Sequence, residues 1–115
     1  MSRPGVPNAD RAVVELRKLT EYLLARAHPV GRGKARFLER LGFSADSAET
    51  LESALRGLIL NPENVVWEDT GFGTKYIVDG LLRGPDGAAP VRTIWIIDAG
   101  AETPRFVAAY PRRVP

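Results

Sequence analysis

The first half of the chain carries apolar residues at helical spacing, in stretches separated by proline and glycine. The apolar positions of the first stretch are Val13, Leu16, Leu19, Leu23 and Leu24. They predict an amphipathic helix over residues 10–25, with Asp10 as its N-cap. A shorter helix is predicted over residues 34–41, and a third over residues 47–61, where Pro62 ends it.

The second half of the chain changes to the pattern of β-strands. Four segments rich in β-branched and aromatic residues are predicted strands, at residues 65–68, 74–82, 91–98 and 105–110. Short turns, each containing glycine, separate the strands, and short turns favour antiparallel neighbours. Three N-terminal helices followed by four strands predict an α+β domain, in which the helices cover one face of an antiparallel β-meander.

The composition is that of one folded domain. The chain has 115 residues, of which 44% are hydrophobic and 26% are charged, and this length leaves room for one core. We expect a flexible leader at residues 1–9, a single domain at residues 10–111 and a tail at residues 112–115. No apolar run has the length of a membrane span and no secretory signal is visible, so no membrane contact and a cytoplasmic location are expected.

The cysteine and histidine counts exclude several classes of chemistry. The chain has no cysteine and one histidine, which excludes disulfides, thiolate metal sites and cysteine nucleophiles, and leaves no zinc cluster. The sequence has neither a Walker-type phosphate loop nor a dinucleotide fingerprint. We therefore expect no metal ion and no cofactor.

Basic residues are concentrated in one short segment. Between positions 26 and 40 the sequence has five basic residues and one acidic residue, although the net charge of the whole chain is only +2. The basic residues are Arg26, Arg32, Lys34, Arg36 and Arg40. A localised positive patch of this kind fits phosphates or an acidic partner, whereas the alternative is an ordinary solvated helix face.

The single histidine, His28, lies in this segment beside a proline. Gly31 and Gly33 let backbone N–H groups approach a ligand, and the helix predicted from Lys34 offers unpaired amides at its positive end. Arg32 and Lys34 add full charges that suit a phosphate. A histidine at such a site can act as a general acid or base near neutral pH, or it can simply cap the loop.

The third predicted strand offers a second set of candidates. Alternation places Thr93 and Trp95 on one face of this strand. On the opposite face, Ile94 and Ile96 have the character of core residues, so Trp95 could face a cleft and offer a stacking surface to a base. The alternative is that Trp95 packs in the core, because aromatic residues are favoured in strands. Tyr110 ends the last predicted strand.

Several short motifs occur in a fixed order along the chain. They are Leu-Thr-Glu-Tyr-Leu-Leu at 19–24, His-Pro-Val-Gly-Arg-Gly-Lys-Ala-Arg-Phe at 28–37, Leu-Gly-Phe at 41–43, Gly-Thr-Lys-Tyr at 73–76, Thr-Ile-Trp-Ile at 93–96 and Tyr-Pro at 110–111. Together they resemble a bacterial family of uncharacterised small domains, found in toxin–antitoxin gene pairs and polymorphic toxins. The helices-then-meander layout is also similar, more distantly, to the ribonuclease toxins grouped around barnase, EndoU, certain colicins and RelE.

The resemblance implies a metal-independent endoribonuclease toxin that cleaves RNA, with tRNA among the candidates, by transesterification. A base removes the 2′-OH proton, cations stabilise the pentacoordinate phosphate, and an acid protonates the leaving 5′-oxygen. The implied partners are RNA and a cognate antitoxin or immunity protein. The implied catalytic residues are His28, Lys34, Thr93 and Tyr110; the phosphate-binding residues are Arg32, Gly33, Arg36 and Lys75; the base-stacking residue is Trp95.

One position departs from the family pattern, in which the last strand tends to read Thr-Ala-Tyr-Pro. Ala108 stands in place of the threonine and removes a hydroxyl that could bind phosphate. The alternative function is a non-catalytic binding module, which uses the same basic loop to hold an acidic protein or nucleic acid. Under that alternative, His28 matters little, and the charges of Arg32 and Lys34 matter most.

Overall fold

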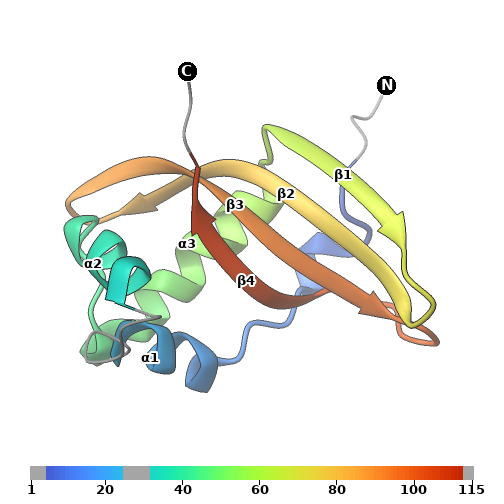
Figure 1. The fold of residues 1–115 in the computed structure, drawn as a ribbon, viewed down its shortest axis with the longest axis horizontal. Helices are drawn as coiled ribbons and strands as arrows, with labels where there is room; N and C mark the ends of the chain where they lie inside the picture. Colours follow the sequence, from blue (N-terminus) through green and yellow to red (C-terminus); the bar gives the residue numbers. More distant parts are fainter. Residues whose placement is uncertain (1–4, 25–31, 113–115) are drawn as a thin grey trace.

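A computed structural model describes residues 5–24 and 32–112, with side chains described for residues 5–21 and 35–112. Figure 1 shows a four-stranded sheet lying over three α-helices, which confirms the predicted α+β class. The helices are α1 (Leu16–Leu24), α2 (Arg32–Arg40) and α3 (Ala48–Leu60), and the 3₁₀ turns are η1 (Ala9–Arg11) and η3 (Ala45–Ser47). The strands are β1 (Asn64–Asp69), β2 (Gly73–Gly84), β3 (Gly87–Asp98) and β4 (Arg105–Pro111).

The sheet is a meander in the order β1-β2-β3-β4, and every neighbouring pair of strands is antiparallel. The strands extend beyond the predicted segments, because ladder pairing continues through small and polar residues that carry no apolar signal. The β2–β3 hairpin is the longest pairing and closes at Gly84 and Gly87. A β-bulge interrupts the pairing of β3 with β4 between Ile94 and Trp95.

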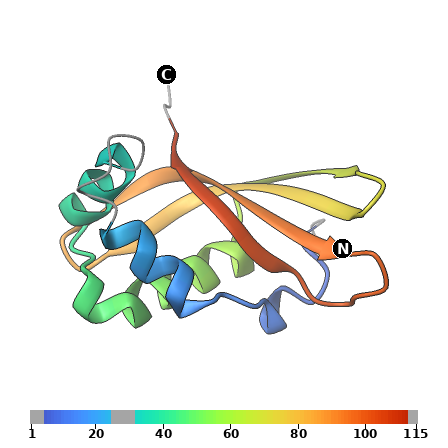
Figure 2. The ribbon, with the colours of Figure 1, turned by 60° about the horizontal axis from the view of Figure 1, so that its bottom comes forward.

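One face of the sheet packs on the helices, as Figure 2 shows, and the core lies between these two layers. The sheet contributes Val78, Leu82, Val91, Trp95 and Phe106, and the helices contribute Leu19, Leu38, Leu51, Leu55, Leu58 and Ile59. We call the opposite side of the sheet the open face. By strand alternation and register, its residues include Val66, Glu68, Lys75, Ile77, Asp79, Arg92, Ile94, Ile96 and Tyr110.

The start of the chain differs from the prediction of one helix over residues 10–25. Asp10 lies in η1, and α1 begins only at Leu16. Between them Val13 forms a bridge to the start of β4: its N–H donates to the carbonyl of Pro104 (2.8 Å), and its carbonyl accepts from the N–H of Phe106 (2.9 Å). Strand-like pairing thus takes the place of the first helical turns.

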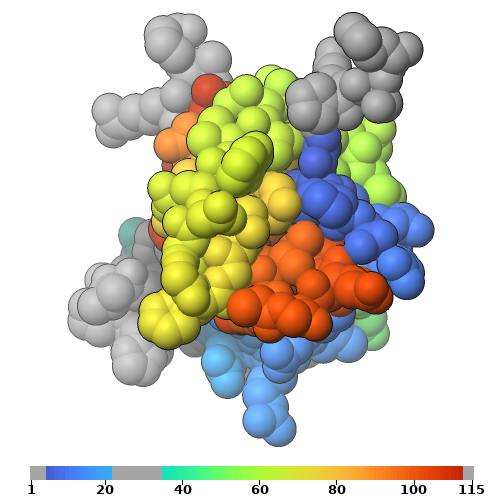
Figure 3. Space-filling model, turned by 90° about the vertical axis from the view of Figure 1, so that its right-hand side faces the viewer, coloured from blue at the N-terminus to red at the C-terminus, as the bar shows by residue number. Residues whose placement is uncertain are grey.

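The same contact is visible from the side of the molecule. Figure 3 shows the N-terminal segment, in blue, packed against the turn between β3 and β4, in orange. The Asn8 side-chain amide donates a hydrogen bond to the carbonyl of Glu102 (2.6 Å) and fastens the segment to that turn. The segment therefore extends the edge of the sheet beside β4.

The other two helices lie close to their predicted positions. Helix α2 begins at Arg32, slightly ahead of the predicted start at Lys34, and ends at Arg40. Gly42 follows with φ of 95°, the left-handed conformation expected of a glycine that ends a helix. None of the helices in the described parts of the chain has the length and apolar character needed to cross a membrane.

Candidate functional site

The basic segment leads directly into α2. His28 lies outside the described residues, so the structure does not place it. Arg32, Gly33 and Lys34 form the first turn of α2 as backbone, and Arg36 is exposed further along the same helix. The predicted phosphate-binding residues of this segment therefore share one helix, and that helix contacts β4.

Thr93 and Trp95 do not face a cleft. Both side chains are fully buried, on the helix-covered face of the sheet. The Trp95 ring packs edge-on against Phe106, with ring centroids 5.3 Å apart. The interpretation of Trp95 as a base-stacking surface is therefore wrong, because its ring has no exposed face, and Thr93 lacks the access that a phosphate would need.

The Thr93 hydroxyl is held inside the core by two hydrogen bonds. It donates to the carbonyl of Val78 (2.8 Å) and accepts from the indole N–H of Trp95 (2.7 Å). The two faces of β3 are exchanged relative to the prediction. Ile94 and Ile96, which are predicted core residues, lie on the open face, and Thr93 and Trp95 lie in the core. A run of apolar and β-branched residues gives no sign of which face the helices cover.

Lys75 lies on the open face of β2, far along the sheet from the end of β4. Its ammonium group lies 3.6 Å from the Glu68 carboxylate, and both side chains are well exposed. A solvent-exposed ion pair of this kind is weak. Lys75 therefore remains accessible, but the register separates it from Thr93 and from Tyr110.

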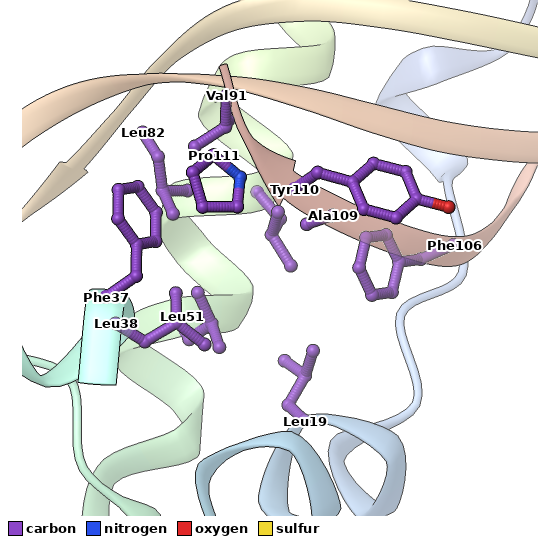
Figure 4. Close-up of a pocket in the computed structure, with 11 residues that line it drawn as sticks. Leu19, Phe37, Leu38, Leu51, Leu82, Val91, Phe106, Ala109, Tyr110 and Pro111 are labelled. Atoms are coloured by element: carbon purple, nitrogen blue, oxygen red, sulfur yellow. The ribbon is translucent and has the colours of Figure 1, made fainter. Parts of the chain in front are cut away.

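Tyr110 stands where β4 approaches α2, at the mouth of an apolar cavity of about 20 Å³. Figure 4 shows Phe37, Leu38 and Leu51 on the helical side of the cavity, and the Tyr110 hydroxyl pointing away from them. The space is about that of a single water and far too small for a nucleobase. Tyr110 is 42% exposed, so any ligand reaches it from outside.

The open face holds an ionic cluster that the sequence pattern did not predict. Asp79, on β2, is only 1% exposed, and it faces Arg92 on β3. Arg92 donates two hydrogen bonds to the carboxylate from one edge of its guanidinium group, through Nε to Oδ1 (2.8 Å) and Nη2 to Oδ2 (3.1 Å). The Nε of Arg112 lies 3.3 Å from Oδ2. The hydrogen bonds to Asp79 raise the pKa of the Arg92 guanidinium above its usual value.

The cluster borders Tyr110. The register pairs Asp79 with Arg92 and Arg92 with Tyr110, so the three residues form one lateral row across the sheet. Arg92, Tyr110, Pro111 and Arg112 line a shallow surface hollow, and Tyr110 and Pro111 also line the cavity beside α2. The end of β4 therefore lies between the basic helix α2 and the two arginines, Arg92 and Arg112. The sequence signal for this cluster is Asp79 itself, a carboxylate within the apolar segment 76–82.

The cavities and side chains described above hold no arrangement suited to a metal ion. Within residues 5–21 and 35–112, no three or more histidine, cysteine, aspartate or glutamate side chains are placed to share a cation.

Comparison with solved structures places this fold among known ones. The chain is similar to a chain in the contact-dependent growth inhibition toxin–immunity protein complex from Klebsiella pneumoniae 342, with a TM-score of 0.72 and 21% sequence identity. The match covers 87% of this chain and 99% of that chain. At this identity the likeness is one of fold.

The sequence itself defines the family. The chain belongs to the family of domains of unknown function designated DUF6883, whose sequence profile matches residues 5–113. No curated protein sequence matches the chain.

Proposed function

We propose that this chain is the toxin domain of a toxin–immunity pair and that it cleaves RNA without a metal ion. The observation that carries the proposal is the fold likeness, over 87% of the chain, to a chain of a contact-dependent growth inhibition toxin–immunity protein complex. The basic residues of α2, and the approach of this helix to Tyr110 at the end of β4, support it from the residues of this chain.

The proposed reaction is transesterification through the RNA 2′-OH. His28, separated from Arg32 only by Pro-Val-Gly in the sequence, acts as the general base that removes the 2′-OH proton. Arg32 and Lys34 stabilise the pentacoordinate phosphate, and Tyr110 donates the proton to the leaving 5′-oxygen. Because the 2′-OH is the nucleophile, the reaction distinguishes RNA from DNA.

Degradation of RNA in the presence of EDTA tests this proposal. The wild-type chain should degrade total RNA, and His28→Ala should slow the reaction by about 10²- to 10⁴-fold, as expected for the loss of a general acid or base. Tyr110→Phe should also slow it, whereas Tyr76→Phe, the matched removal of a hydroxyl that lies elsewhere on the sheet, should leave the rate unchanged. Equal RNA loss with wild type and His28→Ala, or none with either, would overturn the proposal.

A second candidate function is an immunity-type binding role without catalysis. The similar solved structure is a complex that contains an immunity protein, and the basic residues Arg36 and Arg40 are exposed on α2. Under this role the chain holds an acidic partner through its basic segment. Charge reversal at Arg32 and Lys34 should then abolish partner binding, and His28→Ala should have no effect on it.

A further inference from the structure

The Asp79 cluster buries a carboxylate on the open face of the sheet. A carboxylate that is 1% exposed loses almost all of its hydration, and this is costly unless charged partners replace the water. No described helix covers it; the two arginines do, with side chains that are 49% and 36% exposed. The carboxylate is thus buried beneath two guanidinium groups whose outer sides face solvent.

This arrangement gives the arginines a fixed geometry. Arg92 uses Nε and Nη2 to bind Asp79, so its Nη1 donors remain on the side away from that carboxylate. Two guanidinium groups share one carboxylate, so the cluster keeps a net positive charge. Guanidinium groups held in place beforehand lose little conformational entropy when they bind an oxyanion, and their planar forks match the geometry of phosphate.

We propose that Arg92 and Arg112, held by Asp79, form a phosphate-binding subsite for single-stranded RNA on the open face of the sheet. The subsite rests on the proposed function and extends it, because Tyr110 is the cross-strand neighbour of Arg92. An RNA strand whose reacting phosphate lies at Tyr110 has its adjacent phosphate over Arg92 and Arg112. The subsite therefore positions the RNA and takes no part in the proton transfers.

The test uses binding of a fluorescent single-stranded 2′-O-methyl RNA, which has no free 2′-OH and cannot be cleaved. Fluorescence anisotropy should show that Arg92→Gln weakens binding about 10-fold, the size expected for one lost charge-assisted contact. The slope of log affinity against log salt should fall by roughly 0.7 for one lost phosphate contact on a single strand. In Arg92→Gln, Asp79 keeps Arg112 and the amide donor of glutamine, so the fold should persist, which a thermal melt checks.

The matched control is Arg105→Gln, on the same strand as Tyr110 but at its opposite end. Arg105 binds Asp98 with the same fork, through Nε to Oδ2 (2.7 Å) and Nη2 to Oδ1 (3.1 Å), and its side chain is 46% exposed. Hydrogen bonding from Arg105 lowers the pKa of the Asp98 carboxyl below its usual value. Arg105→Gln removes the same charge and should change affinity less than about 3-fold, as expected for a distant charge screened by salt.

Two further variants separate geometry from charge. Arg92→Lys and Arg112→Lys keep the net charge and should each give an affinity between those of wild type and Arg92→Gln, because lysine lacks the planar fork. Equal losses in Arg92→Gln and Arg105→Gln, or unchanged RNA binding in Arg92→Gln, would overturn the subsite. Unchanged RNA binding would leave an acidic protein surface as the ligand of this cluster.

The outcome is independent of the cleavage assay. Loss of 2′-O-methyl RNA binding in Arg92→Gln, together with no RNA cleavage by wild type, would support the subsite and overturn the ribonuclease. Cleavage of total RNA by wild type, with unchanged binding in Arg92→Gln, would do the reverse.

Discussion

At the scale of single residues, the Thr93 hydroxyl connects two strands and the largest side chain of the core. It satisfies the Trp95 indole N–H and reaches the carbonyl of Val78 on the neighbouring strand. Among the described side chains, every buried nitrogen and oxygen has a hydrogen-bond partner. Thr93 therefore has a structural reason to be a hydroxyl residue, whatever chemistry occurs elsewhere.

Replacing Thr93 tests this structural role. Thr93→Val keeps the shape but leaves the Trp95 N–H buried without a partner, so the free energy of unfolding should fall by about 1–3 kcal/mol. Thr93→Ser, which keeps the hydroxyl, should retain the hydrogen bonds and lose only the packing of a methyl group. Urea denaturation measures both. In a Trp95→Phe background the cost of Thr93→Val should shrink, and an undiminished cost would contradict the assignment.

At the scale of elements, the turn of the β2–β3 hairpin is fastened to the end of α2. The Asp86 N–H donates a hydrogen bond to the carbonyl of Leu41 (3.0 Å). Gly84 lies so close to this carbonyl that a Cβ atom would be 2.1 Å from the oxygen. The hairpin and the C-terminal end of α2 therefore approach each other as closely as backbone allows, which fixes the basic helix against the sheet.

Alanine substitution at two glycines should have opposite effects. Gly84→Ala forces the Leu41 carbonyl aside and should lower the free energy of unfolding by about 2–3 kcal/mol. Gly57→Ala, in α3 with nothing within 4 Å of a new Cβ, should raise it by about 0.5–1 kcal/mol, because alanine favours a helix over glycine. Thermal unfolding followed by circular dichroism measures both, and a wild-type melting temperature for Gly84→Ala would contradict this contact.

At the scale of the whole molecule, two positively charged regions meet at the end of β4. Arg36 and Arg40 are exposed on α2, and Arg92 and Arg112 stand on the open face beyond Tyr110. The charges come from distant parts of the sequence, and the fold gathers them on either side of one strand. Clustered charge of one sign raises the local concentration of a polyanion such as RNA.

Expression in a bacterial host tests the toxin role in the intact chain. Wild type should arrest growth when induced, and His28→Ala should restore growth with the same amount of protein on an immunoblot. Arg105→Gln, whose charge lies outside both basic regions, should arrest growth like wild type. Normal growth with wild type at a confirmed level of folded protein would count against toxicity and favour the immunity-type role.

The sequence by itself determined the class of fold and the order of the elements. Helical spacing, the shift to β-branched residues after Pro62, and turn residues such as Gly42 are local signals, and they gave the helices-then-meander layout. They also located α2 within a few residues, and with it the basic segment. These predictions succeeded because periodicity and backbone preference depend on neighbours along the chain.

Only the tertiary structure decided which face of the sheet is buried and which residues form rows across it. Thr93 and Trp95 lie in the core because the helices pack on their side of β3. Val13 pairs with β4 because the β3–β4 turn places the edge of β4 beside the N-terminal segment. Asp79 and Arg92 became neighbours through strand register. Register and sidedness depend on contacts between distant segments, and a slip of one residue exchanges the faces. Local sequence therefore determines the helices-then-meander layout, and long-range pairing determines the candidate site.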